Sequence, residues 1–112
     1  MHNNVNLIGR LTKDPEIVVT ESNKKVCNIV LAVQRNYKNA DGIYEADFIK
    51  CTLWDGIADR ITEYSHKGDL VAVRGWLKVT VTTKDDGDKR YNVEVIVDKL
   101  SFLSSKNNIE KE

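Results

Sequence analysis

The sequence has few of the residues from which metal sites and disulfide frameworks are built. Among its 112 residues there are two cysteines, two histidines and one proline. Cys27 and Cys51 form no Cys-x-x-Cys pair, and His2 and His66 are isolated, so we expect no zinc site and no other cofactor. Both cysteines fall on the predicted inner faces of strands, which favours reduced core side chains over a disulfide.

A net charge is also absent, and so are long apolar runs. The 17 basic residues balance the 17 acidic ones, so the chain has no overall positive field that would attract nucleic acid. A local basic groove on a neutral protein remains compatible with this balance. No apolar run is long enough to cross a membrane, and no charged-then-apolar leader precedes Val5. We therefore expect a cytoplasmic protein that has no membrane partner.

The motifs of common catalytic sites are missing as well. The sequence contains no P-loop, no Ser-His-Asp pattern and no zinc-ligand spacing. Asp55, Asp59 and Glu63 come nearest to an acidic cluster, but their spacing is that of one solvated helix face. A metal-dependent nuclease needs carboxylates that converge in a cleft. The sequence therefore predicts no enzyme and no catalytic residue.

Alternation of apolar and polar residues is what the chain does contain. It predicts strands over 5–11, 26–33, 48–54, 70–82 and 91–97, with a short extended segment at 17–19. The residues expected to point inward are Cys27, Ile29, Leu31, Val33, Ile49, Cys51, Leu53, Val71, Val73, Gly75, Leu77, Val79, Val81, Tyr91, Val93, Val95, Val97, Leu100, Phe102 and Leu103.

Two local signals complete this outline. Gly9 interrupts the first strand, which predicts a bulge or bend. Asp55 is expected to cap a helix over 56–66, and Gly68 is expected to stop it. Five strands with one helix between the third and the fourth are typical of the OB-fold, a five-stranded Greek-key barrel. We expect this all-β domain over residues 1–103, followed by a flexible polar tail over 104–112.

The most informative stretch is 48–54. If it is a strand, Phe48, Lys50 and Trp54 share the face opposite to the core. Two large aromatic rings with a cation between them are unusual on a face that meets only water. They suit the flat bases and the phosphates of a single nucleic-acid strand. A strand that is covered on both sides, or one in a subunit contact, would produce the same pattern.

A second strand repeats this arrangement. Arg74, Trp76 and Lys78 alternate with the apolar residues of 70–82. Trp76 fits a subunit or packing contact as well as it fits a base. The loop after the second strand adds further aromatic and basic residues, namely Arg35, Tyr37, Lys38 and Tyr44.

Several of these residues together resemble bacterial single-stranded-DNA-binding proteins. The resemblance covers roughly residues 3–103 and is carried by the run from Gly9 to Glu16, by Leu31-Ala32-Val33, by 46–54 and by Lys67-Gly68. It implies an OB-fold protomer, usually assembled as a homotetramer, that binds single-stranded DNA with little sequence preference. Such proteins serve DNA replication, recombination, repair or DNA uptake, which implies association with the nucleoid.

The resemblance also carries roles over to individual residues. It places the stacking aromatics at Tyr37, Phe48 and Trp54, whereas a further stacking position corresponds to Thr82, which cannot stack a base. Longer members of the family end in an acidic tip that recruits repair and replication enzymes. This chain ends at Lys111-Glu112, so recruitment by that route is not expected.

The candidate site follows from the residues and the resemblance together. We expect Tyr37, Phe48, Trp54 and Trp76 to stack on bases, with cations following the phosphates: Arg10, Arg35, Lys50, Arg74 and Lys78, with Lys38 and Lys84 in loops. The alternative is an OB-fold interaction module or accessory subunit of a DNA-processing complex, in which the aromatic faces are protein contacts.

Overall fold

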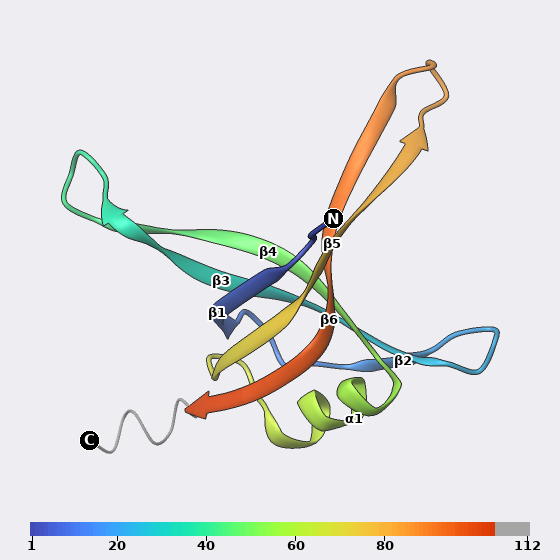
Figure 1. Ribbon diagram of the computed structural model, residues 1–112, viewed down its shortest axis with the longest axis horizontal. Coiled ribbons are helices and arrows are strands. Elements are labelled where there is room, and N and C mark those ends of the chain that lie inside the picture. Colours follow the sequence, from blue (N-terminus) through green and yellow to red (C-terminus); the bar gives the residue numbers. More distant parts are fainter. Residues whose placement is uncertain (105–112) are drawn as a thin grey trace.

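The computed structural model describes residues 1–104, which fold into six strands and one helix (Figure 1). In chain order the elements are β1 (Val5–Leu11), β2 (Ile17–Val19), β3 (Lys25–Lys38), β4 (Tyr44–Trp54), α1 (Asp55–Tyr64), β5 (Leu70–Thr83) and β6 (Lys89–Ser104). Ser104, predicted to begin the tail, is the last residue of β6, and the rest of the predicted tail lies outside the described residues. No helix within residues 1–104 is long and apolar enough to span a membrane.

Five of the strands close into a barrel, which confirms the predicted fold class. The sheet order is β1-β5-β6-β4-β3-β2, and an additional pairing of β1 with β3 completes the ring. β2 pairs only with β3 and stands outside the ring. The helix lies between β4 and β5, which are the third and fourth barrel strands along the chain, as predicted.

Gly9 marks the place where the barrel closes. The predicted alternative of a bulge is wrong, because the pairing of β1 with β5 runs without a break from Val5 to Arg10. A Cβ atom at Gly9 would lie 2.8 Å from the carbonyl oxygen of Ala32 on β3. Glycine is therefore needed for the close approach of β1 to β3.

The core forms where apolar faces of the strands meet the helix. Cys27, Leu31, Leu53, Val71 and Val95 are fully buried, as the alternation predicted. Ala58 and Ile61 of α1 pack into the same cluster, and Figure 1 shows the helix lying across one end of the barrel.

The helix start differs from the prediction. Trp54 occupies the cap position, and no side chain caps the helix N-terminus. Asp55 is the first helical residue, and its carboxylate instead accepts a hydrogen bond from the backbone N–H of Lys25, at 3.3 Å. The helix ends at Tyr64, before the predicted stop at Gly68.

Two hairpins extend far beyond the barrel (Figure 1). One joins β3 to β4, and the other joins β5 to β6. The second hairpin makes part of the predicted core wrong, because several residues expected to point inward are exposed on it: Leu77, Val79, Val81, Tyr91 and Val93. Phe102 and Leu103, near the end of β6, are exposed as well. On this hairpin alternation identified the apolar face, but beyond the barrel that face has no core to cover it.

The two cysteines are free and buried, as predicted. Burial raises the pKa of the Cys51 thiol to about 12, and it also raises the pKa of Cys27. Both thiols therefore remain protonated and unreactive at neutral pH, which is the behaviour of core residues.

Candidate nucleic-acid interface

The outward side chains of β4 lie over small neighbours on β3. In the antiparallel pairing of these strands, Phe48 stands opposite Ala32 and Lys50 opposite Val30. Directly paired residues project from the same face of a sheet. Because alanine covers little of its neighbour, the Phe48 ring remains 69% exposed. The aromatic-cation pattern predicted for β4 is thus open to solvent.

The same surface continues across β6 to β5. Thr52 of β4 pairs with Ile96 of β6, and Ile96 pairs with Trp76 of β5. Lys78 pairs with Glu94 and lies two residues beyond Trp76 on that face. The pairing of the strands therefore places the aromatic and basic residues of β4 and those of β5 on one surface. We call it the outer face; it consists of Phe48, Lys50, Thr52, Trp54, Trp76, Lys78 and Glu94.

Both tryptophans of the chain belong to the outer face. Trp54 is 39% exposed and Trp76 is 40% exposed. Each ring is therefore partly supported by its neighbours and partly available for stacking. Phe48 and Trp54 are six residues apart, which is about 20 Å along a strand. This separation leaves room between them for more than one base.

Two grooves meet at Lys50, one between β4 and β6 and the other over β3 and β4. One has a volume of about 380 Å³ and is lined by Phe48, Lys50 and Asn92, among others. The next has a volume of about 340 Å³ and is lined by residues that include Lys50, Thr52 and Glu94. Lys50 lines both grooves, so its ammonium group can serve phosphates on either side.

Arg10 lies at the margin of this surface. It pairs with Ala32, which in turn pairs with Phe48, so the three residues form one row across β1, β3 and β4. Its Nη1 donates a hydrogen bond to the carbonyl oxygen of Gly68 at 2.9 Å, which fixes the position of the guanidinium. The structure thus brings Arg10 to the face that carries Phe48.

Arg35, in contrast, lies on the opposite side of the β3–β4 hairpin. Its guanidinium binds Asp47 and Glu45, with shortest distances of 2.9 Å and 2.8 Å. These acidic residues alternate with Phe48 along β4 and so project from the other face. The hydrogen bond from Arg35 lowers the pKa of Asp47 and raises that of Arg35. The predicted cation is therefore already paired and is not next to Lys50.

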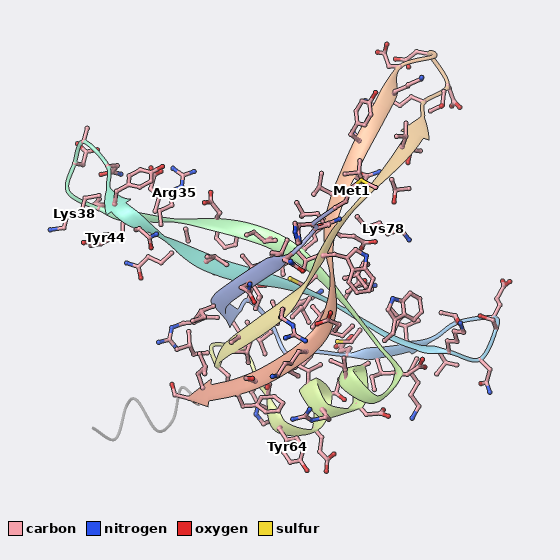
Figure 2. The ribbon with its side chains drawn as sticks, viewed as in Figure 1. Met1, Arg35, Lys38, Tyr44, Tyr64 and Lys78 are labelled. Carbon is pink, nitrogen blue, oxygen red and sulfur yellow. The ribbon has the colours of Figure 1, made fainter. Side chains whose placement is uncertain are left out.

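Two aromatic residues of this hairpin, Tyr37 and Tyr44, are exposed. Tyr37 is 64% exposed and lies on β3 two residues beyond Arg35. Lys38 places its ammonium group 5.7 Å from the centre of the Tyr44 ring. Figure 2 shows Lys38 and Tyr44 together on one side of the hairpin and Arg35 on the other.

Two further predicted cations lie away from the grooves. Arg74 Nε donates to Asp98 at 3.2 Å, and the residue lines a different groove, of about 400 Å³, with Asn6 and Lys99. Lys84 lies in the turn at the tip of the β5–β6 hairpin, where its backbone N–H bonds to Asp88. Lys78 differs from these two cations, because it projects from β5 close to the barrel (Figure 2).

Comparison with known proteins gives the family. Residues 2–103 match the model of the Single-strand binding protein family. The chain belongs to this family. It is 41% identical over 106 residues to the single-stranded DNA-binding protein B of Bacillus subtilis, a match that covers 95% of this chain and 94% of the relative. It is 40% identical over 108 residues to the single-stranded DNA-binding protein 1 of Streptococcus pyogenes, covering 96% of this chain and 83% of the relative.

Membership of the Single-strand binding protein family has consequences for the alternatives. The family consists of DNA-binding proteins that are not enzymes, in agreement with the absence of catalytic motifs from the sequence. Within residues 1–104, no three His, Cys, Asp or Glu side chains are grouped so that they could hold a metal ion. The resemblance recognised from the motifs is confirmed.

One feature of the outer face was not predicted. Glu94 lies among the aromatic and basic residues, and Thr52 Oγ1 is 2.6 Å from its Oε2. Alternation in β6 could have placed Glu94 outward, since Val93 and Val95 were expected inward. The contact with Thr52, however, depends on the parallel pairing of β4 with β6, which no local pattern in the sequence indicates.

Proposed function

We propose that this protein binds single-stranded DNA along the outer face, without strong dependence on base sequence. The observation that carries the proposal is the exposed Phe48 ring beside Lys50, in one register with Trp54 and Trp76. Stacked aromatics and cations on a barrel surface suit a strand whose bases are unpaired.

The two kinds of contact have different tasks. Ring faces accept any base, and on OB-folds each stack typically contributes about 1–3 kcal/mol. Cations neutralise phosphates, so binding weakens with salt, with a slope of about −0.7 per phosphate neutralised in a log-log plot. Lys50 and Lys78 have this second role at the centre of the face, and Arg10 has it at the margin.

The hairpins extend the path of the strand beyond the barrel. Tyr37 offers an exposed ring on the β3–β4 hairpin, and Lys84 offers a charge at the tip of the β5–β6 hairpin. Arg35 and Arg74 already pair with carboxylates, which offset part of the charge that they would offer to a phosphate. We therefore assign these two arginines a smaller share of the affinity than Lys50.

We also propose a homo-oligomer that acts on single-stranded DNA in replication, recombination, repair or DNA uptake, in the cytoplasm with the nucleoid. The support for association is the side of the β5–β6 hairpin opposite to the outer face. It exposes Leu77, Val79, Val81, Tyr91 and Val93 in one stretch. Exposed apolar surface of this kind marks a protein contact.

Sedimentation velocity with fluorescent oligonucleotides tests both proposals in one experiment. We expect the free protein to sediment with a mass that is a multiple of the 12.7 kDa protomer. Labelled oligo-dT should co-sediment with it, whereas a duplex of equal length should not. A protomer-sized species would contradict the oligomer. Free migration of oligo-dT at low salt would contradict the DNA-binding function and favour a protein-interaction module.

A further inference from the structure

Beyond Trp54 the outer face continues onto β2, the strand that stands outside the barrel (Figure 1). Trp54 pairs with Val26 of β3, and Val26 pairs with Val18 of β2. Directly paired residues project from the same face of a sheet, so these three side chains form one row across β4, β3 and β2. The row is apolar throughout.

The neighbouring row gives the orientation of this one. Ile17 pairs with Cys27, which pairs with Leu53. Cys27 and Leu53 are fully buried, and Ile17 packs against the same core. Because successive side chains of a strand point to opposite faces, Val18 points away from the core, and it is 59% exposed.

A cation lies at the far end of the apolar row. The backbone N–H of Thr20 donates to the carbonyl oxygen of Lys24 at 2.8 Å, which continues the pairing of β2 with β3. Lys24 precedes Val26 by two residues, so its side chain falls on the side of Val26. Lys24 is exposed and forms no salt bridge within residues 1–104. The row therefore combines an aromatic ring, apolar surface and a cation, as the outer face itself does.

The start of α1 offers no such continuation to a nucleic acid. Asp55 is exposed directly after Trp54, and Asp59 follows one turn later. The ammonium group of Lys25 lies 3.2 Å from Asp59, whereas Asp55 receives only a backbone N–H of Lys25. Carboxylates repel phosphates, so a strand stacked on Trp54 is directed toward β2 rather than along the helix.

We propose that single-stranded DNA leaves β4 at Trp54 and crosses β3 onto β2, where Val18 and Lys24 form a further DNA-binding subsite. This inference rests on the proposed function. Val18 lies two strands from Trp54, about 10 Å at the usual strand spacing, so a base next to the one stacked on Trp54 can pack on its methyl groups. Lys24 binds the phosphate beside this base. Contact between methyl groups and the face of a base excludes water without reading the base, so the subsite adds affinity and no sequence preference.

The test compares Val18→Glu with Val19→Glu. Val18 and Val19 are adjacent on β2, are 59% and 58% exposed, and point to opposite faces. The two variants therefore make the same charge change at similar exposure. We expect Val18→Glu to weaken binding of labelled oligo-dT about tenfold or more at low salt, by anisotropy, because it places a carboxylate beside the phosphates. Val19→Glu should stay within about twofold of the wild-type affinity.

Two milder variants separate the two contacts of the subsite. Val18→Ala removes two methyl groups and should weaken binding about two- to fourfold, with no change in the salt dependence. Lys24→Gln should reduce the slope of the log-log salt plot by about 0.7, which corresponds to one phosphate contact. Circular dichroism verifies the fold of each variant. If Val18→Glu does not fold, the comparison of Val18→Ala with Val19→Ala decides.

The outcomes separate this inference from the proposed function. Wild-type affinity in the Val18 variants would overturn the subsite and leave single-strand binding intact. Equal losses in Val18→Glu and Val19→Glu would also overturn it, since the effect would then not belong to one face of β2. A smaller sedimenting mass of Val18→Ala, with unchanged affinity, would make Val18 a subunit contact instead. Failure of the wild-type protein to bind oligo-dT would overturn the proposed function itself.

Discussion

Replacing Trp54 by alanine is expected to weaken oligo-dT binding by about 1–3 kcal/mol, which corresponds to about 5- to 150-fold in the dissociation constant. Trp54 offers a large ring that is 39% exposed on the outer face. The loss follows because alanine keeps the backbone of β4 but removes the surface on which a base stacks. Anisotropy of a labelled oligo-dT measures the change.

The control for this variant is an aromatic residue away from the outer face. Tyr64 lies exposed at the end of α1 (Figure 2). Its ring meets that of Phe102 edge-on, with ring centres 5.8 Å apart. Tyr64→Ala should therefore bind oligo-dT as the wild-type protein does. Both variants should keep the wild-type circular dichroism spectrum. Wild-type affinity in Trp54→Ala would remove this ring from the site.

Gly75→Ala is expected to have the largest effect on stability. A Cβ atom at this position would overlap the carbonyl oxygen of Ile96, with Val97 also in contact. Gly75 lies at the irregularity where β5 and β6 change register, so the two strands pack too closely there for any side chain. Overpacking of this kind typically costs about 1–3 kcal/mol, and contact with backbone, which cannot rotate away, favours the upper end.

The matched control is Gly56→Ala in α1. A Cβ atom at Gly56 would have no heavy atom within 4 Å. Alanine is the better helix former, so this variant should gain about 0.4–1 kcal/mol. Urea unfolding of the two variants measures the difference. A Gly75→Ala protein as stable as the wild type would contradict the close approach of β5 and β6 described above.

The candidate site was predictable where it depends on a single strand. Phe48, Lys50 and Trp54 alternate with buried residues, and this local pattern identified their face before any pairing was known. Trp76 and Lys78 were found in the same way on β5. The sequence did not predict that these residues of β4 and β5 form one surface. That arrangement requires Ile96 of β6 to pair with both Thr52 and Trp76.

Other features depend on contacts between residues far apart in the chain. Arg35 looked like a free cation, but its carboxylate partners Glu45 and Asp47 are 10 and 12 residues away and reach it only through the β3–β4 pairing. Likewise, alternation cannot tell how far a strand continues past the barrel. Val79 and Val93 therefore looked like core residues, although they lie on the exposed hairpin.

Titration of the intrinsic tryptophan fluorescence with oligo-dT tests the central claim most directly. The chain has two tryptophans, Trp54 and Trp76, and both lie on the outer face. Bases that stack along this face should quench the fluorescence to saturation, added salt should restore it, and duplex DNA should leave it unchanged. Binding of oligo-dT, detected by anisotropy, without any change in the tryptophan fluorescence would contradict the claim that the strand lies on the outer face.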